Sequence, residues 1–419
     1  MIRFVLSRIG YGLLVLWGVV TVVFFLFHLS PGDPVRNLVG ENASSEMVEN
    51  IRRKLDLDLP SGKRYVYYLN DLSPISVYTL NVEGGRRNWD PEVQGGWKCI
   101  ALSGNNILVL KPPYFKRSFL SDRSVTSILL EAMPGTAVLA VSAISLALLF
   151  GLLLGIFASL NKDSAADRTI LFVSALGMAG PSFFMAILIA WLGAVVWRDH
   201  VTLAVWPLLF LIGFIIWSFL KRKNGGVKYA MRWGLSIVGS WIIFTWIIPS
   251  AAWNPHLTLP GTGLDMTGSL YSVSVWEGAY VDLRNLILPA ITLAIRPLAV
   301  IVQLTRSSML EVLSLDYIRT ARAKGLSERR VVFVHALRNA VNPVITAVSG
   351  WFASLLAGAV FVEFVFGWKG LGQEMFLAIE KQDMPVVMGG VILIAAVFVV
   401  INLLVDVAYG WIDPRVRRA

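Results

Sequence analysis

The residues best suited to chemistry lie in Asp316–Pro343, which reads DYIRTARAKGLSERRVVFVHALRNAVNP. Lysine and arginine outnumber its two acidic residues, and strongly apolar stretches flank it at Leu286–Leu304 and Val344–Phe366. A short basic loop between two membrane spans is expected on the cytoplasmic side. Alanine and the long basic side chains favour helix, and Gly325 offers a helix end with a left-handed backbone. We therefore expect a short cytoplasmic helix in this loop.

Such a helix allows two kinds of contact, and neither is covalent. Small Ala and Gly side chains permit the close approach of another protein, while Arg and Lys orient that protein through an acidic rim. Alternatively, a basic amphipathic loop can lie on anionic lipid. Composition alone favours the docking surface and the lipid-bound loop equally.

The other reactive residue types form no catalytic or metal-binding set. His28, His200, His256 and His335 are scattered without ligand spacing, and a single cysteine, Cys99, cannot form an internal disulfide. The sequence contains no GxxxxGK[ST] motif and therefore no recognisable phosphate-binding loop. We expect no enzymatic activity, no metal and no cofactor in this chain. If the process it serves is driven by ATP, a separate subunit must supply the energy.

The composition is that of an integral membrane protein. Of 419 residues, 56% are hydrophobic and 15% are charged, and the mean hydropathy is +0.66. Soluble proteins carry about 25% charged residues. The net charge of +10 is concentrated in short segments beside the apolar runs, as in 221–232 and the C-terminal tail. This is the positive-inside pattern of membrane proteins, and it argues against nucleic-acid binding.

We expect an all-α polytopic membrane protein with about eight transmembrane helices and both termini in the cytoplasm. The first run is longer than the apolar core of a typical signal peptide, and no small-x-small cleavage site follows it, so we interpret it as an uncleaved span. The expected spans are about 9–29, 134–158, 169–197, 201–220, 233–252, 286–304, 344–366 and 386–409. The spans near 200–252 form a pair, because two added spans return the chain to its original side.

The expected domains follow this order. Residues 1–30 are the N-terminal transmembrane helix, 31–130 are an external region, and 131–419 are the transmembrane domain with its cytoplasmic loop at 305–343. Within the external region, Ser45–Leu57 has the apolar spacing of an amphipathic helix. Residues 70–113 alternate Gly and Asn pairs with β-like runs, so a small mixed or β-rich insertion is expected there.

Polar or helix-breaking residues inside spans suggest a transport pathway. Arg296 lies in the middle of one span and Glu363 near the external end of another, whereas Asp406 lies near an internal end where it can reach water. The sequence Gly177–Pro181 predicts a helix kink, because proline removes a backbone hydrogen bond. Pro181, Arg296 and Glu363 are the pathway candidates, with plain helix packing as the alternative for the kink.

Asp316–Pro343 resembles the cytoplasmic "EAA" loop of ABC-importer permeases, in the version used by dipeptide and oligopeptide importers. The general pattern asks for Glu-Ala-Ala, three residues and then Gly. Ala321 and Gly325 match it, whereas Arg319 and Thr320 replace Glu and Ala, as is common in the peptide branch. Further matches are PGDP at Pro31–Pro34, TRSSMLE at Thr305–Glu311, GWKGLG at Gly367–Gly372 (with Lys369 in place of the usual Pro), MPVV at Met384–Val387, and Asn402–Arg415.

This resemblance covers the first 60 residues, roughly 115–195, and nearly everything from 285 onward. It implies the type I ABC-importer permease fold with six core spans, to which the pair near 200–252 is added. It also implies a bacterial inner-membrane location and a role as the membrane-spanning subunit that carries short peptides by alternating access. In the family the loop forms a coupling helix that docks on the ATPase. The residues that this places at the ATPase are Tyr317, Arg319, Thr320, Ala321, Ala323, Lys324, Gly325 and Leu326.

The partners implied by the resemblance are a second homologous permease, two cytoplasmic ABC ATPases that bind ATP and Mg²⁺, an external solute-binding protein and the lipid bilayer. Two alternatives remain open. The same branch also carries nickel chelates and other small solutes. An ion-coupled secondary transporter would use intramembrane carboxylates and inverted repeats. Mid-span acids are scarce in the sequence, and we find no convincing internal repeat.

Overall fold

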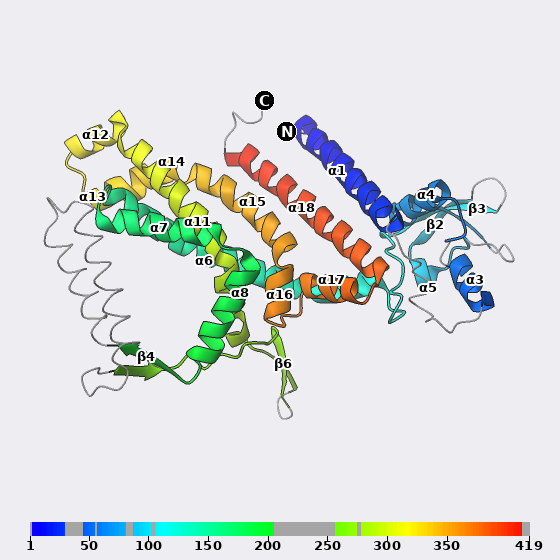
Figure 1. Ribbon diagram of the computed structural model, residues 1–419. Helices are drawn as coiled ribbons and strands as arrows, with labels where there is room; N and C mark the ends of the chain where they lie inside the picture. The colour runs from blue at the N-terminus through cyan, green and yellow to red at the C-terminus, as the bar shows by residue number, and fades with distance from the viewer. Residues whose placement is uncertain are drawn as a thin grey trace. The chain divides into compact units, whose positions relative to one another are not determined.

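The computed structural model describes residues 2–29, 45–54, 57–80, 87–101, 105–204, 256–274 and 278–412. Helices dominate these residues (Figure 1). The chain divides into two compact units. The first comprises Met1–Thr136, Leu356–Val360 and Lys369–Ala419, and the second comprises Ala137–Leu355 and Phe361–Trp368.

Two long apolar helices lie side by side in the first unit (Figure 1). They are α1 (Ile2–Leu29) and α18 (Met384–Ile412), and the short helix α17 (Leu371–Glu380) precedes α18. Gly12 allows the close packing, because a β-carbon there would lie 2.6 Å from the Val399 side chain. Arg8 pairs with Asp406 at 3.2 Å. The sequence predicts only that the Asp406 carboxylate can reach water. In the structure it also has a charged partner, Arg8, within the same unit.

The part of this unit between α1 and α6 contains short helices and one antiparallel sheet. Its elements are α3 (Ser45–Lys54), α4 (Ser61–Leu72), β1 (Ile75–Thr79), α5 (Pro91–Gln94), β2 (Trp97–Ala101) and β3 (Asn106–Leu110), with strand order β1-β3-β2. The three strands lie within residues 70–113, where β-like runs were expected, and α3 begins at Ser45, where an amphipathic helix was expected. That this segment is an external insertion stays a prediction. Helix α4 was not anticipated from the sequence.

Helix α4 anchors this region to the first span. Tyr68 is buried in a cluster with Val20, Val23 and Phe24 of α1. The Tyr65 and Thr21 hydroxyls are 2.6 Å apart and share a hydrogen bond. Aromatic side chains of this kind combine an apolar ring with a polar tip, which suits a position where a span leaves the membrane.

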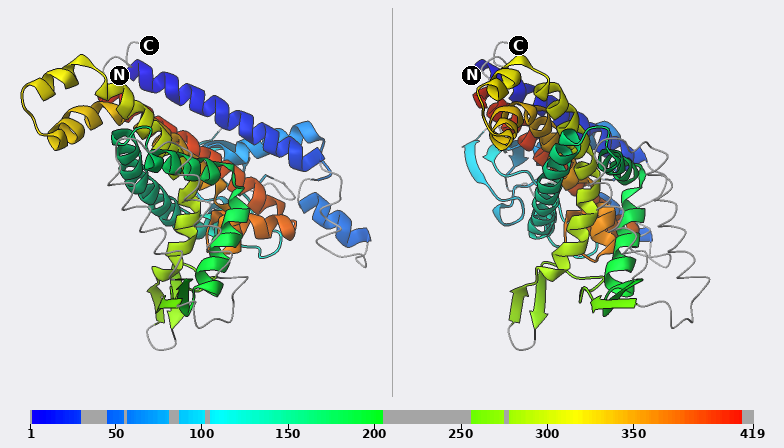
Figure 2. Two further views of the ribbon diagram at one scale, coloured as in Figure 1. Left: turned by 60° about the vertical axis from the view of Figure 1, so that its left-hand side comes forward. Right: turned by 90° about the vertical axis from the view of Figure 1, so that its left-hand side faces the viewer.

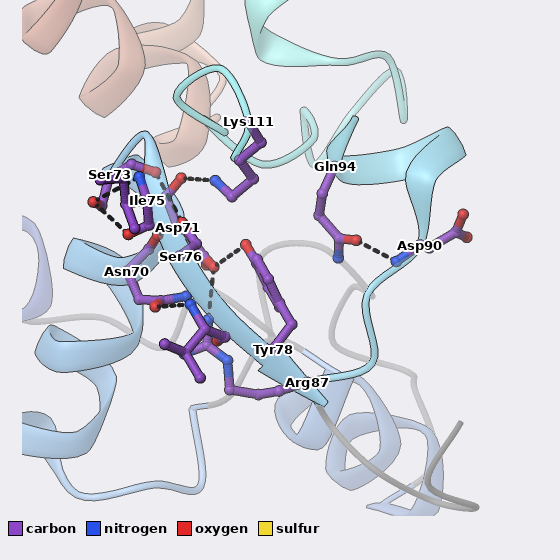
Figure 3. A network of polar contacts seen from close by, with 11 residues as sticks. Asn70, Asp71, Ser73, Ile75, Ser76, Tyr78, Arg87, Asp90, Gln94 and Lys111 are labelled. Carbon is purple, nitrogen blue, oxygen red and sulfur yellow. Dashed lines mark hydrogen bonds and ion pairs between the residues drawn. The ribbon is translucent and has the colours of Figure 1, made fainter. Parts of the chain in front are cut away.

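A polar network centred on Asp71 joins α4 to the sheet (Figure 3). The Asp71 carboxylate accepts hydrogen bonds from Tyr78 Oη and Arg87 Nη2, each at 3.0 Å. The Asp71 backbone carbonyl accepts from Lys111 Nζ. Asn70 pairs with the Val77 backbone through both its amide nitrogen and its amide oxygen, as one strand pairs with another. The network therefore fixes β1 and the segment after β3 against the end of α4.

Burial shifts two pKa values in this network. It lowers the pKa of Lys111 from 10.5 to about 8, because the ammonium loses its hydration. Burial and the neighbouring Asp71 carboxylate raise the pKa of Tyr78 above its usual value of 10.0. Both side chains are almost fully enclosed.

The second unit is built on helices, with two pairs of antiparallel strands. Its elements are the larger part of α6 (Val125–Leu160), α7 (Ala165–Ala179), α8 (Ser182–Trp191), the π-helical turn η1 (Leu192–Val196), α11 (Arg284–Leu313), α12 (Asp316–Ala323), α13 (Glu328–Arg330), the π-helical turn η3 (Val331–Ala336), α14 (Leu337–Ala340), most of α15 (Asn342–Gly358) and α16 (Val360–Val365). The two antiparallel pairs are β4 (His200–Ala204) with β5 (His256–Pro260), and β6 (Tyr271–Ser274) with β7 (Gly278–Val281).

Helices α6 and α11 pack closely through a Gly-x-x-x-Gly pair. A β-carbon on Gly151 would lie 2.6 Å from the Ile301 side chain, and one on Gly155 would lie 2.5 Å from the Thr305 side chain. Helices approach this closely in membranes where small residues repeat every four positions. The sequence GLLLG carries this signal, although the sequence analysis did not use it.

Among the described residues, four helices are long and apolar enough to cross a membrane, and up to six spans result if each of two bent pairs counts as one. The span expected at 169–197 is broken into α7 and α8, which are bent by 109°. The span expected at 344–366 is likewise divided, into α15 and α16. Strand β4 occupies 201–204, so these four residues do not belong to a span as expected. Residues 205–255, which hold most of the expected pair, lie outside the described residues, and the total of eight stays a prediction.

The Gly155 packing gives a stability prediction. Replacing Gly155 by alanine puts a β-carbon into the Thr305 side chain, and such overpacking costs about 1–3 kcal/mol. The matched control is Gly18→Ala in α1, where nothing lies within 4 Å of the added carbon. That change should be neutral, or stabilise by up to about 1 kcal/mol through helix propensity. Melting temperatures of the purified variants measure both effects, and equal values would contradict the close contact.

The Lys111 environment predicts a pH effect. Because the folded pKa is below the unfolded one, the unfolded state binds more protons between pH 8 and 10.5, so stability rises with pH in that window. Above about pH 10 the raised pKa of Tyr78 acts in the opposite direction. Between pH 7.5 and 9.5, proteolysis within residues 57–124 should slow about tenfold relative to a Lys111→Met variant, which corresponds to about 1.4 kcal/mol. If the ratio of the two proteolysis rates, wild type to Lys111→Met, does not change with pH, the burial of this ammonium is contradicted.

Candidate docking site at helix α12

The expected basic helix is present as α12 (Asp316–Ala323), in the part of the chain that follows α11. Helix α11 ends at Leu313, and the turn at 314–315 redirects the chain into α12. Figure 2 shows α12 and the segment after it projecting beyond the end of α11. The polar faces of such a projecting helix remain open to another molecule.

The inward face of α12 rests on a hydrophobic core. Ile318 is fully buried and Ala321 is 8% exposed. The other buried members of this cluster come from α6, α11, η3 and α14, and they are Ile156, Met309, Val312, Val331, Val332, Ala336 and Ala340. The position of α12 is therefore set by apolar contact with four other elements of its own unit.

The outward face carries most of the residues expected to dock. Tyr317, Arg319, Thr320, Ala323, Lys324 and Gly325 are exposed. Ala321 instead points inward, and Leu326 is half-buried against the same core. These two residues support the helix from within the chain, so the close approach to a partner that the sequence analysis assigned to Ala321 does not fit its burial.

The end of α12 depends on the backbone of Gly325. Its φ is +75°, in the left-handed region that disfavours side chains, and open space surrounds the position of a β-carbon. The amide of Gly325 bonds to the Arg322 carbonyl at 2.9 Å, and that of Leu326 bonds to the Ala321 carbonyl at 3.4 Å. The predicted helix end at Gly325 is thus present. The position favours glycine because of its left-handed backbone, since no atom of the described residues would crowd a side chain there.

Charges on this surface are only loosely paired. Arg322 pairs with Glu328 at 2.9 Å and Arg319 with Asp316 at 3.3 Å, and all four side chains are exposed. Exposed pairs of this kind contribute little to stability. Lys324 has no partner among the described residues. The surface therefore presents basic groups that are free to exchange partners with an acidic rim.

A hydrogen-bonded tyrosine steadies the base of this surface. The Tyr317 hydroxyl donates to the His335 carbonyl at 3.3 Å and accepts from Asn339 Nδ2 at 2.8 Å. The ring is 40% exposed. Tyr317 thus links α12 to η3 and α14 while leaving part of its ring available for contact.

The expected pathway residues have different environments. Pro181 lies at the 109° break between α7 and α8, which confirms a bend and shows it to be sharper than a kink. Arg296 is exposed in the middle of α11. Glu363 is fully buried in α16, so it does not face an open pathway within this chain. The described residues contain no group of three or more His, Cys, Asp or Glu side chains suited to a metal.

Comparison with known sequences identifies the family. Residues 225–418 match the family described as "Binding-protein-dependent transport system inner membrane component", and residues 1–79 match its N-terminal counterpart. The whole chain aligns at 32% identity with 99% of the di/tripeptide transport system permease protein DppB of Pseudomonas aeruginosa. It also aligns over its full length at 33% identity with all of the dipeptide permease DppB of Haemophilus influenzae, and at 31% with 99% of that of Escherichia coli K12. The chain belongs to this permease family.

The permease also contains a buried ion pair that the sequence analysis missed. Asp167 in the first turn of α7 pairs with Arg306 of α11. A carboxylate three residues after Ser164 marks a helix start, which the sequence does show. Its partner lies 139 positions away, and no local pattern connects the two.

Two substitutions separate the roles of Gly325 in the permease. If the left-handed backbone is what matters, Gly325→Asn should retain more transport than Gly325→Ala, because asparagine tolerates this conformation and alanine loses about 1–2 kcal/mol. If close approach of a partner is what matters, the smaller alanine should perform better. We expect Gly325→Asn to transport more than Gly325→Ala, measured as uptake in cells that hold equal amounts of the two variants in the membrane. The reverse order would show that space beside Gly325 is limited in the assembly.

Proposed function

We propose that this permease carries short peptides across the bacterial inner membrane, powered by separate ATPase subunits that dock on α12. The single observation that carries the docking proposal is the exposed basic face of α12 on its apolar support. Relatives aligned over the full chain are named as dipeptide or di/tripeptide permeases, which supports the choice of peptides.

The proposed docking surface comprises the exposed members of the predicted set. These are Tyr317, Arg319, Thr320, Ala323, Lys324 and Gly325. An acidic groove on the ATPase would receive them, with exposed Arg329 and Arg330 adding to the attraction. ATP and Mg²⁺ would bind to that partner alone, because this chain has no phosphate-binding loop. The permease itself performs no covalent step.

We further propose that the complete transporter contains a second homologous permease, two ATPases and an external solute-binding protein. We also propose that both termini lie in the cytoplasm. The positions of Arg3 and Arg8 before the first apolar run support this orientation. Arg8 pairs with Asp406 near the end of α18, which supports placing both ends on one side.

Transport would follow alternating access. Closure of the two ATPases would draw the docked helices together, and α11 would carry that movement toward the membrane. The break at Pro181 between α7 and α8 would supply a bend along the path, and exposed Arg296 would face the path or a neighbouring subunit. Hydrolysis would then reset the spans. Nickel chelates or other small solutes remain possible cargo, with ion-coupled transport as the less favoured mechanism.

Crosslinking tests the docking proposal directly. A Lys324→Cys variant, made in a Cys99→Ser background, should form a crosslink to the ATPase in native membrane vesicles. A Ser61→Cys control is exposed in the external region and should form none. The vesicles should also accumulate a labelled dipeptide only when ATP is supplied inside. Absence of the Lys324→Cys crosslink would refute docking on α12, and uptake that depends on a proton gradient without ATP would refute the energy source.

A further inference from the structure

The buried ion pair between α7 and α11 lies near the end of α11 that precedes the proposed docking helix. Arg306 Nε donates to Asp167 Oδ1 at 2.6 Å, and Arg306 Nη2 donates to Asp167 Oδ2 at 2.7 Å. The Asp167 side chain is 1% exposed and that of Arg306 is 19% exposed. Because two parallel hydrogen bonds join the guanidinium to the carboxylate, this two-point contact fixes the relative orientation of the two groups as well as the distance between them.

The carboxylate also holds the turn between α6 and α7. Asp167 Oδ2 accepts a hydrogen bond from the Asp163 amide at 2.9 Å, and Ser164 Oγ accepts from the Asp167 amide at 3.1 Å. Asp163 has a φ of +62°, so the turn adopts a backbone that needs support from its surroundings. One carboxylate thus connects the α6–α7 turn to a guanidinium on α11.

The pair lies on the route from α12 into the membrane. Arg306 is seven residues before the end of α11, about 10 Å along the helix. In the same stretch, Thr305 contacts α6 at the position of Gly155, and Ile156 of α6 belongs to the core below α12. Displacement of α12 therefore reaches α6 and α11 through apolar contact, and reaches the start of α7 through the ion pair.

We propose that Asp167 and Arg306 are positioning residues, which make α7 follow the docking helix during transport. This inference rests on the proposed function. Stability alone does not explain the pair, because burying two charges costs hydration that apolar side chains of similar size do not lose. The two-point contact gives what apolar packing does not, namely a fixed orientation between α11 and the helix that runs to the break at Pro181.

The test compares variants in the complete transporter, reconstituted with its partner subunits. The readout is the ratio of dipeptide uptake to ATP hydrolysis, with retention of the ATPase during purification as the measure of assembly. Asp167→Asn leaves the guanidinium without its charge partner and should lower the ratio at least tenfold. The combination of Asp167→Leu with Arg306→Met removes both charges. It should keep the wild-type melting temperature and assembly, yet show the same low ratio.

The double variant separates positioning from stability. If it restores the wild-type ratio, or if it fails to assemble, the pair serves folding and the proposal is overturned. The exchange of Asp167→Arg with Arg306→Asp should recover part of the ratio, and no recovery together with normal assembly would also count against a paired role. If the wild-type transporter itself shows no ATP-dependent uptake, the proposed function fails instead.

Spin labels add a readout that does not depend on activity. Lys162 in the α6–α7 turn and Ser327 after α12 are both exposed, and both lie outside the ion pair and the docking surface, so cysteines replacing them in a Cys99→Ser background can carry the labels. In the otherwise wild-type transporter the distribution of distances between the two labels should remain narrow with and without nucleotide. In the double apolar variant the distribution should broaden when nucleotide is added. An unchanged distribution would show that α7 follows α12 without the pair.

Discussion

Burial of Ile318 on the inward face of α12 is the contact on which the exposed polar face of this helix depends. Helix α12 is only eight residues long, and a helix of that length is marginal in water by itself. Its stability comes from the shared core with α6, α11, η3 and α14. Because this apolar contact sets the direction of the helix, it also decides which polar residues remain outside. The surface is thus a consequence of packing on the opposite side of the same helix.

Two different interactions join this helix to the spans. Apolar contact connects α12 to α11 and α6, where Gly155 brings the two long helices together. A buried ion pair connects α11 to the start of α7. Apolar packing is non-directional, whereas the guanidinium–carboxylate contact fixes an angle. Together they hold the proposed docking surface, the α6–α7 turn and the helix leading to Pro181 within one compact unit.

The region between α1 and α6 is also held by local contacts. Tyr68 fills a cluster on α1, and Asp71 joins α4 to β1 and to the segment after β3. The sheet of three short strands is therefore supported by a helix that is itself fixed to a membrane span. Such support is needed because so small a sheet does not supply enough buried surface alone.

The sequence by itself determined the membrane class, the approximate positions of the four long apolar helices among the described residues, the β-like runs between residues 75 and 110, and the helix end at Gly325. Each of these follows from local composition or from one residue's backbone preference. Only the tertiary structure decided that Ala321 faces inward, that Glu363 is enclosed and that Asp167 meets Arg306. Those outcomes depend on which helices pack together, and the periodicity of one segment does not specify its neighbour when nearly every face is apolar.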